Sequence, residues 1–127
     1  MPLTSFDHAN VRTANLDAMV TWYADILGLH AGFRPNFSFP GAWLYLGDLA
    51  VIHLVGTDAA PVAKEGDNLR LEHLAFRASD FPAFKAKLDA KGIPYSLNRL
   101  DEIETVQVNV HDPDGNHLHI DFPTGDA

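Results

Sequence analysis

The chain has 127 residues, of which 46% are hydrophobic and 20% charged, which is enough apolar material for one core but not for two large domains. Its 17 acidic residues against 9 Lys and Arg give a net charge of -8, which argues against nucleic acid as a partner because phosphate binding needs clustered positive charge. With no Cys and 7 His, the chain has only imidazole and carboxylate to offer a transition metal. We expect a single domain over residues 1–127.

Neither a targeting segment nor a membrane span is expected. The first ten residues, MPLTSFDHAN, lack the basic and apolar regions of a signal peptide, and no apolar run approaches membrane-spanning length. Together with the lack of Cys, these features predict a soluble, cytoplasmic protein without a membrane partner.

The first half of the chain predicts a strand, a helix and a hairpin. Residues 6–11 alternate polar and apolar side chains, as strands do. Apolar residues then recur with helical spacing over 16–27, and Gly28 stands where a left-handed C-cap belongs. A Gly-Asp turn joins two apolar strands over 42–46 and 49–55.

The second half repeats this order after a segment over about 57–69 that has the Pro, Gly and charged composition of an exposed linker. A strand is predicted over 71–77, and a shorter apolar stripe predicts a helix that Gly92 closes. Three strands follow, one from about residue 95 and the others over 105–110 and 117–122.

Landmarks of the first half recur in the second half at nearly one spacing. His73 follows His8 by 65 residues, Gly92 follows Gly28 by 64, and His119 follows His53 by 66. Two copies are too few and the period is too long for a solenoid array. We therefore expect an α+β domain of two tandem βαβββ modules, over about 4–56 and about 70–123.

Four of the seven His occupy equivalent places in the two modules. His8 and His73 are expected on the first strand of each module, and His53 and His119 on the last strand. If the modules pair about a pseudo-twofold axis, equivalent positions approach one another and the four imidazoles converge. Imidazole is a good ligand for Fe, Zn, Ni, Co and Mn, so the matched spacing predicts one divalent metal ion at the site.

Each of these His also has an alternative interpretation. His119 alternates with apolar neighbours, a pattern that the solvent face of a strand also produces. His8 and His73, taken singly, are typical of structural residues. His53 lies within an apolar strand, where an imidazole is expected to be paired or to bind a metal. The other three are predicted to be structural or exposed: His30, His111 and His117.

Four stretches resemble a known superfamily: FDHANV at 6–11, WYADILGL at 22–29, LEHLAF at 71–76 and DPDGNHLH at 112–119. They are similar to the vicinal oxygen chelate superfamily, which contains glyoxalase I, extradiol dioxygenases and bleomycin resistance proteins. The segment over 34–48 is also similar to a bacterial subgroup described as glyoxalase/dioxygenase-like. The resemblance implies that the modules pair into a curved mixed-sheet cup, and that the protein forms a homodimer with modules paired within a chain or exchanged between chains.

The resemblance places the metal ligands on the same four His, with one departure. The superfamily typically has Glu at the position of His119, and glyoxalase I also has Glu at that of His53. Glyoxalase-type isomerisation uses a metal-bound carboxylate to move a proton, so the all-His set places oxygenase chemistry ahead of isomerase or lyase chemistry. Asp121, two residues past His119 on the same strand face, is the candidate catalytic residue, as base, outer carboxylate or substitute ligand. An exposed Asp at the end of a strand is the alternative.

Aromatic and Arg side chains are candidates for a pocket that binds a small-molecule substrate. The apolar candidates are Phe33, Phe37, Phe39, Trp43 and Tyr45, and the candidate partners of a substrate anion are Arg34 and Arg99. Aromatic residues at strand spacing are also typical of a core.

Three functions remain open on this sequence. The first is a metal-dependent glyoxalase/dioxygenase-like enzyme that chelates a small substrate with vicinal oxygens, such as a catecholate. The second is a metal-free protein that binds a small molecule or antibiotic, as bleomycin resistance proteins do. The third is a structural metal site that four protein ligands close completely.

Overall fold

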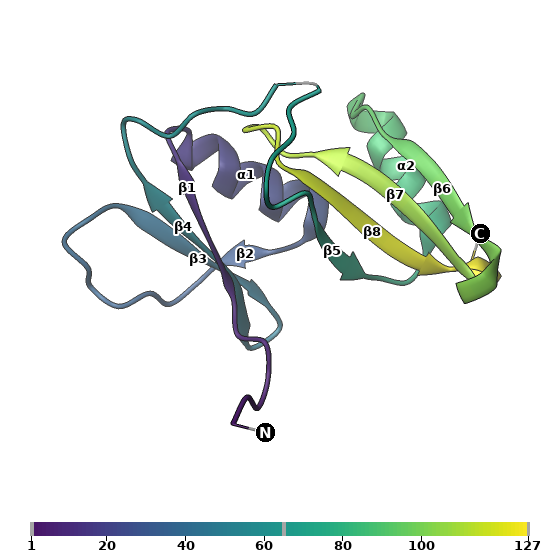
Figure 1. Cartoon of the computed structure of the whole chain (residues 1–127), viewed down its shortest axis with the longest axis horizontal. Coiled ribbons are helices and arrows are strands. Elements are labelled where there is room, and N and C mark those ends of the chain that lie inside the picture. Colours follow the sequence, from purple (N-terminus) through teal and green to yellow (C-terminus); the bar gives the residue numbers. More distant parts are fainter. Residues whose placement is uncertain (1, 65, 127) are drawn as a thin grey trace. The chain divides into compact units, whose positions relative to one another are not determined.

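The computed structural model describes residues 2–64 and 66–126, and the chain divides after Val62 into two compact units, called unit 1 and unit 2 here (Figure 1). Both units have the predicted βαβββ order, so the expected α+β fold of two equivalent modules is confirmed. Among the described residues, no helix combines the length and the apolar character needed to cross a membrane.

Unit 1 is a four-stranded mixed sheet with one helix. Its elements are β1 (Ala9–Thr13), α1 (Leu16–Leu27), β2 (His30–Ala31), β3 (Gly41–Leu46) and β4 (Leu49–Gly56). The strand order is β1-β4-β3-β2, with β1 parallel to β4 and the other pairs antiparallel. The βαβββ order requires three strands after the helix, and the first of them, the two-residue β2, is one whose position was not predicted from the sequence.

The helix of unit 1 follows its sequence pattern. Met19, Tyr23 and Ile26 are buried at helical spacing, and α1 contacts β2, β3 and β4. At its end Gly28 adopts the left-handed conformation (φ 69°), and its N–H donates to the carbonyl of Ala24. A Cβ at Gly41, where β3 begins, would lie 2.3 Å from the carbonyl oxygen of Leu54, so the close β3–β4 contact requires glycine there.

Unit 2 repeats this arrangement. Its elements are β5 (Leu74–Arg77), α2 (Phe81–Lys91), β6 (Ser96–Leu100), β7 (Thr105–His111) and β8 (His117–Pro123), with short 3-10 turns η1 (Asp101–Ile103) and η2 (Thr124–Asp126). The strand order is β5-β8-β7-β6, again with the first and last strands parallel. Phe81 and Phe84 of α2 contact the ring of Phe122, which anchors the helix to β8.

The two faces of β8 differ in character. Leu118, Ile120 and Phe122 are buried in the core, while the intervening His117, His119 and Asp121 lie on the other face. That other face is not simply solvated, since the exposed fraction of His119 is 8%.

A tight turn over residues 112–116 joins β7 to β8. The buried Asp112 accepts hydrogen bonds at Oδ1 from the backbone N–H groups of Asp114 (3.0 Å) and Asn116 (2.9 Å), and at Oδ2 from the Asn116 side chain (2.9 Å). Gly115 has a φ of +83°, and a Cβ there would lie 2.3 Å from the carbonyl oxygen of Ala63. The turn places His111 directly opposite His117 in the β7–β8 ladder.

Candidate metal centre

The predicted His fall at matching places in the two strand ladders. In unit 1 Asn10, two residues after His8, lies opposite His53; in unit 2 Ala75, two residues after His73, lies opposite His119. His8 and His73 were predicted to lie within the first strands. This detail is wrong, because each His immediately precedes its strand, β1 or β5. Each His nevertheless stands where its chain enters the sheet, and the register is identical in both units.

The first pair of imidazoles is a ring stack. The rings of His8 and His53 lie with centroids 3.5 Å apart and an interplanar angle of 12°. Trp43, opposite His53 in the β3–β4 ladder, stacks on His53 at 4.0 Å and 11°. His53 is therefore held between an indole and a second imidazole.

This environment lowers the pKa of His53. Burial disfavours the imidazolium, and the nearby His8 does so by charge repulsion, while a hydrogen bond with the Ala50 backbone and the charge of Asp7 act in the opposite direction. Since only neutral imidazole binds a metal, the lowered pKa keeps His53 in its ligand form at neutral pH.

The second pair lies in unit 2. The ring centroids of His73 and His119 are 4.3 Å apart with an interplanar angle of 44°. His119 is buried, and the side chain of His73 is 39% exposed. Each unit thus brings together two of the four predicted ligands, from the start of its first strand and from its last strand.

Carboxylates accept hydrogen bonds from Nδ1 of three of these four imidazoles. The pairs are His8 with Asp7 at 2.5 Å, His73 with Glu72 at 2.5 Å and His119 with Asp121 at 2.6 Å. This arrangement puts the ring proton on Nδ1 and leaves the Nε2 lone pair for a metal, and ligand His commonly have such a partner. The donor set therefore fits a divalent transition metal.

Asp7 and Glu72 were not among the site residues predicted from the sequence, although a signal for them was present. Glu72 follows Asp7 by the same 65 residues that separate His73 from His8, so the repeat carries an acid–His dipeptide in each copy. Hydrogen bonding from His73, together with the charge of His117 close by, lowers the pKa of the Glu72 carboxyl.

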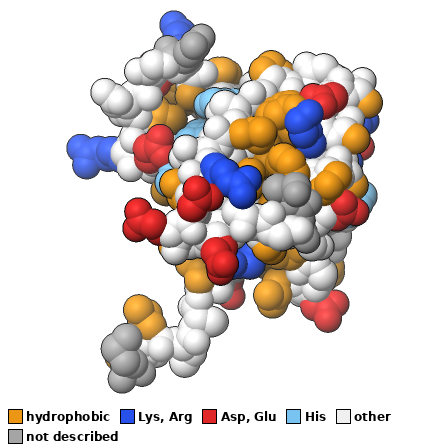
Figure 2. Space-filling view, turned by 90° about the vertical axis from the view of Figure 1, so that its right-hand side faces the viewer, with side chains coloured by type: hydrophobic (Ala, Val, Ile, Leu, Met, Phe, Trp, Pro, Cys, Tyr) orange, Lys and Arg blue, Asp and Glu red, His pale blue; other side chains and the backbone are white. Residues whose placement is uncertain are grey.

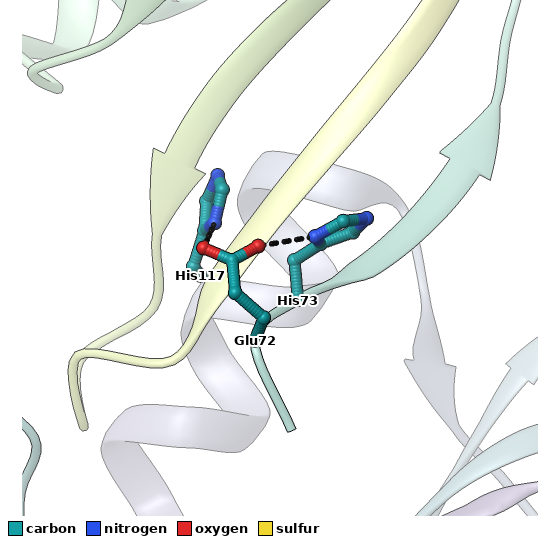
Figure 3. Close-up of side chains that lie close together, drawn as sticks. All are labelled: Glu72, His73 and His117. Carbon is teal, nitrogen blue, oxygen red and sulfur yellow. Dashed lines mark hydrogen bonds and ion pairs between the residues drawn. The ribbon is translucent and has the colours of Figure 1, made fainter. Parts of the chain in front are cut away.

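A further cluster surrounds Glu72 in unit 2. Glu72 lies between His73 and His117, and one ligand atom from each of the three lies within 4.8 Å of the others (Figure 3). Its Oε2 is 3.5 Å from Nδ1 of His117, whose Nε2 donates to Oδ1 of Asn109 at 2.8 Å. The ring of His111 stacks near His117, with centroids 5.3 Å apart. His117, which was predicted to be structural or exposed, thus lies beside the predicted ligand His73, and His111 lies beside His117.

Most of the aromatic pocket candidates cluster in unit 1 and connect to the ring stack. Phe37 stacks on Phe39 at 5.1 Å and lies 6.3 Å from Trp43, which in turn contacts His53. Phe37 and Phe39 are 42% and 43% exposed, so they form a surface cluster instead of a core. The guanidinium of Arg34 lies over both rings, at 4.9 and 5.1 Å, and donates to the carbonyl of Phe39.

The other pocket candidates have partners of their own. The hydroxyl of Tyr45 donates to the carbonyl of Phe33, whose ring is highly exposed, and Arg99 in unit 2 forms an ion pair with Asp101 at 2.9 Å. The cleft in unit 2, of about 510 Å³, is lined instead by the segment before β5 and by the Glu72 cluster, including Lys64, Asp67, Leu69, Glu72, His111 and His117. Figure 2 shows His side chains, in pale blue, reaching the molecular surface.

Comparison with known proteins agrees with the fold. The family model of the Glyoxalase/Bleomycin resistance protein/Dioxygenase superfamily matches residues 5–120. No curated protein matches the sequence.

Similar solved structures cover nearly the whole chain. A glyoxalase/dioxygenase from Nostoc punctiforme has a TM-score of 0.80 at 20% identity, covering 96% of this chain and 92% of its own. A glyoxylase/bleomycin resistance protein/dioxygenase domain from Frankia sp. EAN1pec has a TM-score of 0.76 at 20% identity, covering 95% and 98%. A lactoylglutathione lyase from Agrobacterium tumefaciens has a TM-score of 0.71 at 18% identity, covering 96% of each chain. The family match over 5–120, on a fold of two βαβββ units, means that the chain belongs to the glyoxalase/bleomycin resistance protein/dioxygenase superfamily.

Proposed function

We propose that the protein is a metal-dependent enzyme that acts on a small substrate with vicinal oxygens, and that His8, His53, His73 and His119 hold one divalent Fe, Zn, Ni, Co or Mn ion. The observation that carries the proposal is the carboxylate at Nδ1 of three of these imidazoles. Such partners orient the ligand rings and raise their basicity. When bound, the ion would chelate the substrate oxygens and stabilise an enediolate- or catecholate-like anion as a Lewis acid.

The charges around the four His suit an anionic substrate. Neutral imidazoles leave the full positive charge on an ion, whereas the superfamily's usual Glu ligands reduce it. The acidic partners Asp7, Glu72 and Asp121 accept hydrogen bonds from Nδ1 of the imidazoles. In this role they strengthen the imidazole ligands and leave the remaining coordination positions of the ion to a substrate. We assign Asp121 the role of positioning His119, and ring-cleaving oxygenase chemistry remains ahead of isomerase or lyase chemistry.

The aromatic cluster is the proposed wall of the substrate pocket. Phe37, Phe39 and Trp43 offer flat apolar surfaces that continue to the ring of His53, which suits an aromatic substrate such as a catechol. Arg34, over Phe37 and Phe39, supplies a positive charge beside them. The homodimer and the cytoplasmic location remain part of the proposal, on the resemblance and the composition alone.

Metal analysis of the protein purified without added metal tests the proposal. We expect a stoichiometric transition metal, and we expect His53→Ala and His119→Ala each to lower metal uptake on reconstitution. His30→Ala, which replaces an exposed His on β2 outside both pairs, is the matched control. Metal-free protein together with unchanged uptake in both variants would overturn the proposal.

A second candidate function is metal-free binding of a small aromatic molecule, favoured by the exposed Phe37–Phe39 stack under Arg34. A structural metal closed by four ligands is the third. Oxygen consumption by Fe(II)-loaded protein with a panel of catechols separates them. Consumption that is lost in His119→Ala supports the enzyme, while a loaded but inert protein points to the structural ion.

A further inference from the structure

We propose that Glu72, His73 and His117 form a second site for a divalent transition metal, complete within unit 2 and independent of the His of unit 1. It differs from the set proposed above in using the carboxylate of Glu72 as a ligand and in including His117. Figure 3 shows the Glu72 carboxylate between the two imidazoles. The proposal goes beyond the proposed function and shares one residue with it, His73.

The donor atoms are close enough to serve one ion. One ligand atom from each residue lies within 4.8 Å of the other two, with Oε1 of Glu72 at 2.5 Å from Nδ1 of His73 and Oε2 at 3.5 Å from Nδ1 of His117. Two imidazoles and one carboxylate are the set that non-heme Fe(II) sites use, and they also suit Zn. Three protein ligands leave positions open for water or a substrate.

The orientation of His117 indicates that a cation belongs beside it. Its Nε2 donates to Oδ1 of Asn109 at 2.8 Å, so a neutral ring has its lone pair on Nδ1, on the side of the Glu72 carboxylate. When His117 is protonated, its Nδ1 proton faces Oε2 of Glu72 at 3.5 Å, and a metal ion bound to both atoms would take the place of that proton. Asn109 then acts as the outer partner that ligand His usually have.

The β7–β8 turn makes this arrangement rigid. His117 is the first residue of β8 and lies opposite His111, and the Asp112 hydrogen bonds fix the turn between them. The ring of His111 stacks near that of His117, so it can supply a further imidazole close to the ion.

An ion can reach this site from solvent. Glu72, His111 and His117 line the cleft of about 510 Å³, and the side chain of Glu72 is 72% exposed. A route of entry is one of the features that a real metal site must have.

The two proposed sites use different nitrogen atoms of His73. For the ion of the proposed function, His73 keeps its Nδ1 proton on Glu72 and uses Nε2. In the second site the ion takes the place of that proton and binds Nδ1. Loss of His117 therefore affects only the second site, and loss of His8 and His53 affects only the first.

The test is equilibrium dialysis of Co(II) against the full chain carrying His8→Ala and His53→Ala. We expect this background variant to retain one Co(II) per chain. Adding His117→Ala or Glu72→Gln is expected to weaken its binding by about tenfold or more, whereas adding His119→Ala leaves the affinity unchanged. Circular dichroism confirms that each variant is folded, and His30→Ala is the control for loss of an exposed His.

Two results would overturn this inference. One is a background variant that binds no Co(II), and the other is Co(II) binding that His119→Ala weakens and His117→Ala does not. Neither result affects the proposed function, which is tested in the otherwise wild-type chain by His53→Ala and His119→Ala.

Discussion

Asp121 accepts a hydrogen bond from Nδ1 of His119 at 2.6 Å, from two residues further along the same face of β8. Replacing this carboxylate with an amide removes the charge that makes the imidazole a better ligand. We expect Asp121→Asn to lower metal affinity by about 10–100-fold, measured by competition with a chelator.

The control for this substitution is Asp101→Asn, which removes an exposed carboxylate of the same unit that is paired with Arg99. We expect it to leave metal affinity unchanged. Equal affinities of Asp121→Asn and the wild-type chain would show that Asp121 does not support a ligand.

The stacked environment of His53 predicts an unusual titration in the metal-free protein. Burial and the charge of His8 both disfavour its imidazolium, so NMR is expected to give a pKa below the ordinary value of 6.5. His8→Ala removes the second of these causes and should raise the pKa of His53, leaving the effect of burial. A His53 pKa at or above 6.5 in the wild-type chain would contradict this account of the stack.

The same shift makes stability depend on pH. Because the folded pKa of His53 is depressed, the unfolded chain takes up this proton at a higher pH than the folded chain does. The contribution of neutral His53 to the free energy of unfolding is therefore complete above pH 6.5, and it declines as the pH falls toward the pKa of the folded state. Urea unfolding of metal-free wild-type and His53→Gln chains at pH 7.5 and 5.5 measures this, with the smaller loss on acidification expected in the variant.

The β7–β8 turn is expected to depend on Asp112. Asp112→Ala removes a buried carboxylate that accepts three hydrogen bonds in the turn, two of them from backbone N–H groups. We expect a loss of about 2–4 kcal/mol in the free energy of unfolding, measured by urea denaturation. Asp101→Ala, at an exposed site in the same unit, should change it by less than about 0.5 kcal/mol.

The carboxylate of Asp89 links helix α2 to the segment that follows it. Asp89 accepts from the hydroxyl of Tyr95 at 2.7 Å and from Lys85 at 3.0 Å, and these two bonds lower the pKa of its carboxyl below 3.8. Tyr95→Phe removes the larger cause and should raise this pKa toward 3.8, whereas Lys85→Met should raise it less. Carboxyl NMR titration distinguishes the two, and a larger effect of Lys85→Met would contradict this ranking.

The lowered pKa of Asp89 also determines the pH range in which these two hydrogen bonds stabilise the fold. Their contribution is present above pH 3.8 and is lost as the pH falls through the folded pKa, because protonation removes the charge that both donors bind.

Much of the fold could be predicted because local patterns agree with the tertiary structure. Helical spacing and a left-handed glycine define α1 and α2, and alternation defines β7 and β8. The start of β5 was placed too early because a strand needs a partner. The β5–β8 ladder begins with Leu74 opposite Leu118. The residues before His117 belong to the turn that Asp112 stabilises, so they do not form a strand with which an earlier part of β5 could pair.

Only the part of the candidate site that recurs in both halves of the sequence could be predicted. The equal spacing identified His8 and His73, and likewise His53 and His119, as equivalent positions. The structure adds that the rings in contact are His8 with His53 in one unit and His73 with His119 in the other. His117 has no counterpart in that comparison. Its approach to Glu72 depends on where β8 begins, which the turn determines and residue spacing does not reveal.

The parallel pairing of first and last strands has a consequence for folding order. His8 and His53 are 45 residues apart in the sequence, and His73 and His119 are 46, so each imidazole pair rests on a strand contact that spans most of its unit. Contacts of such high order close late, after the local helix and hairpin have formed. For the proposed metal site, we therefore expect the ion to bind after each unit has folded, so that metal uptake follows folding instead of starting it.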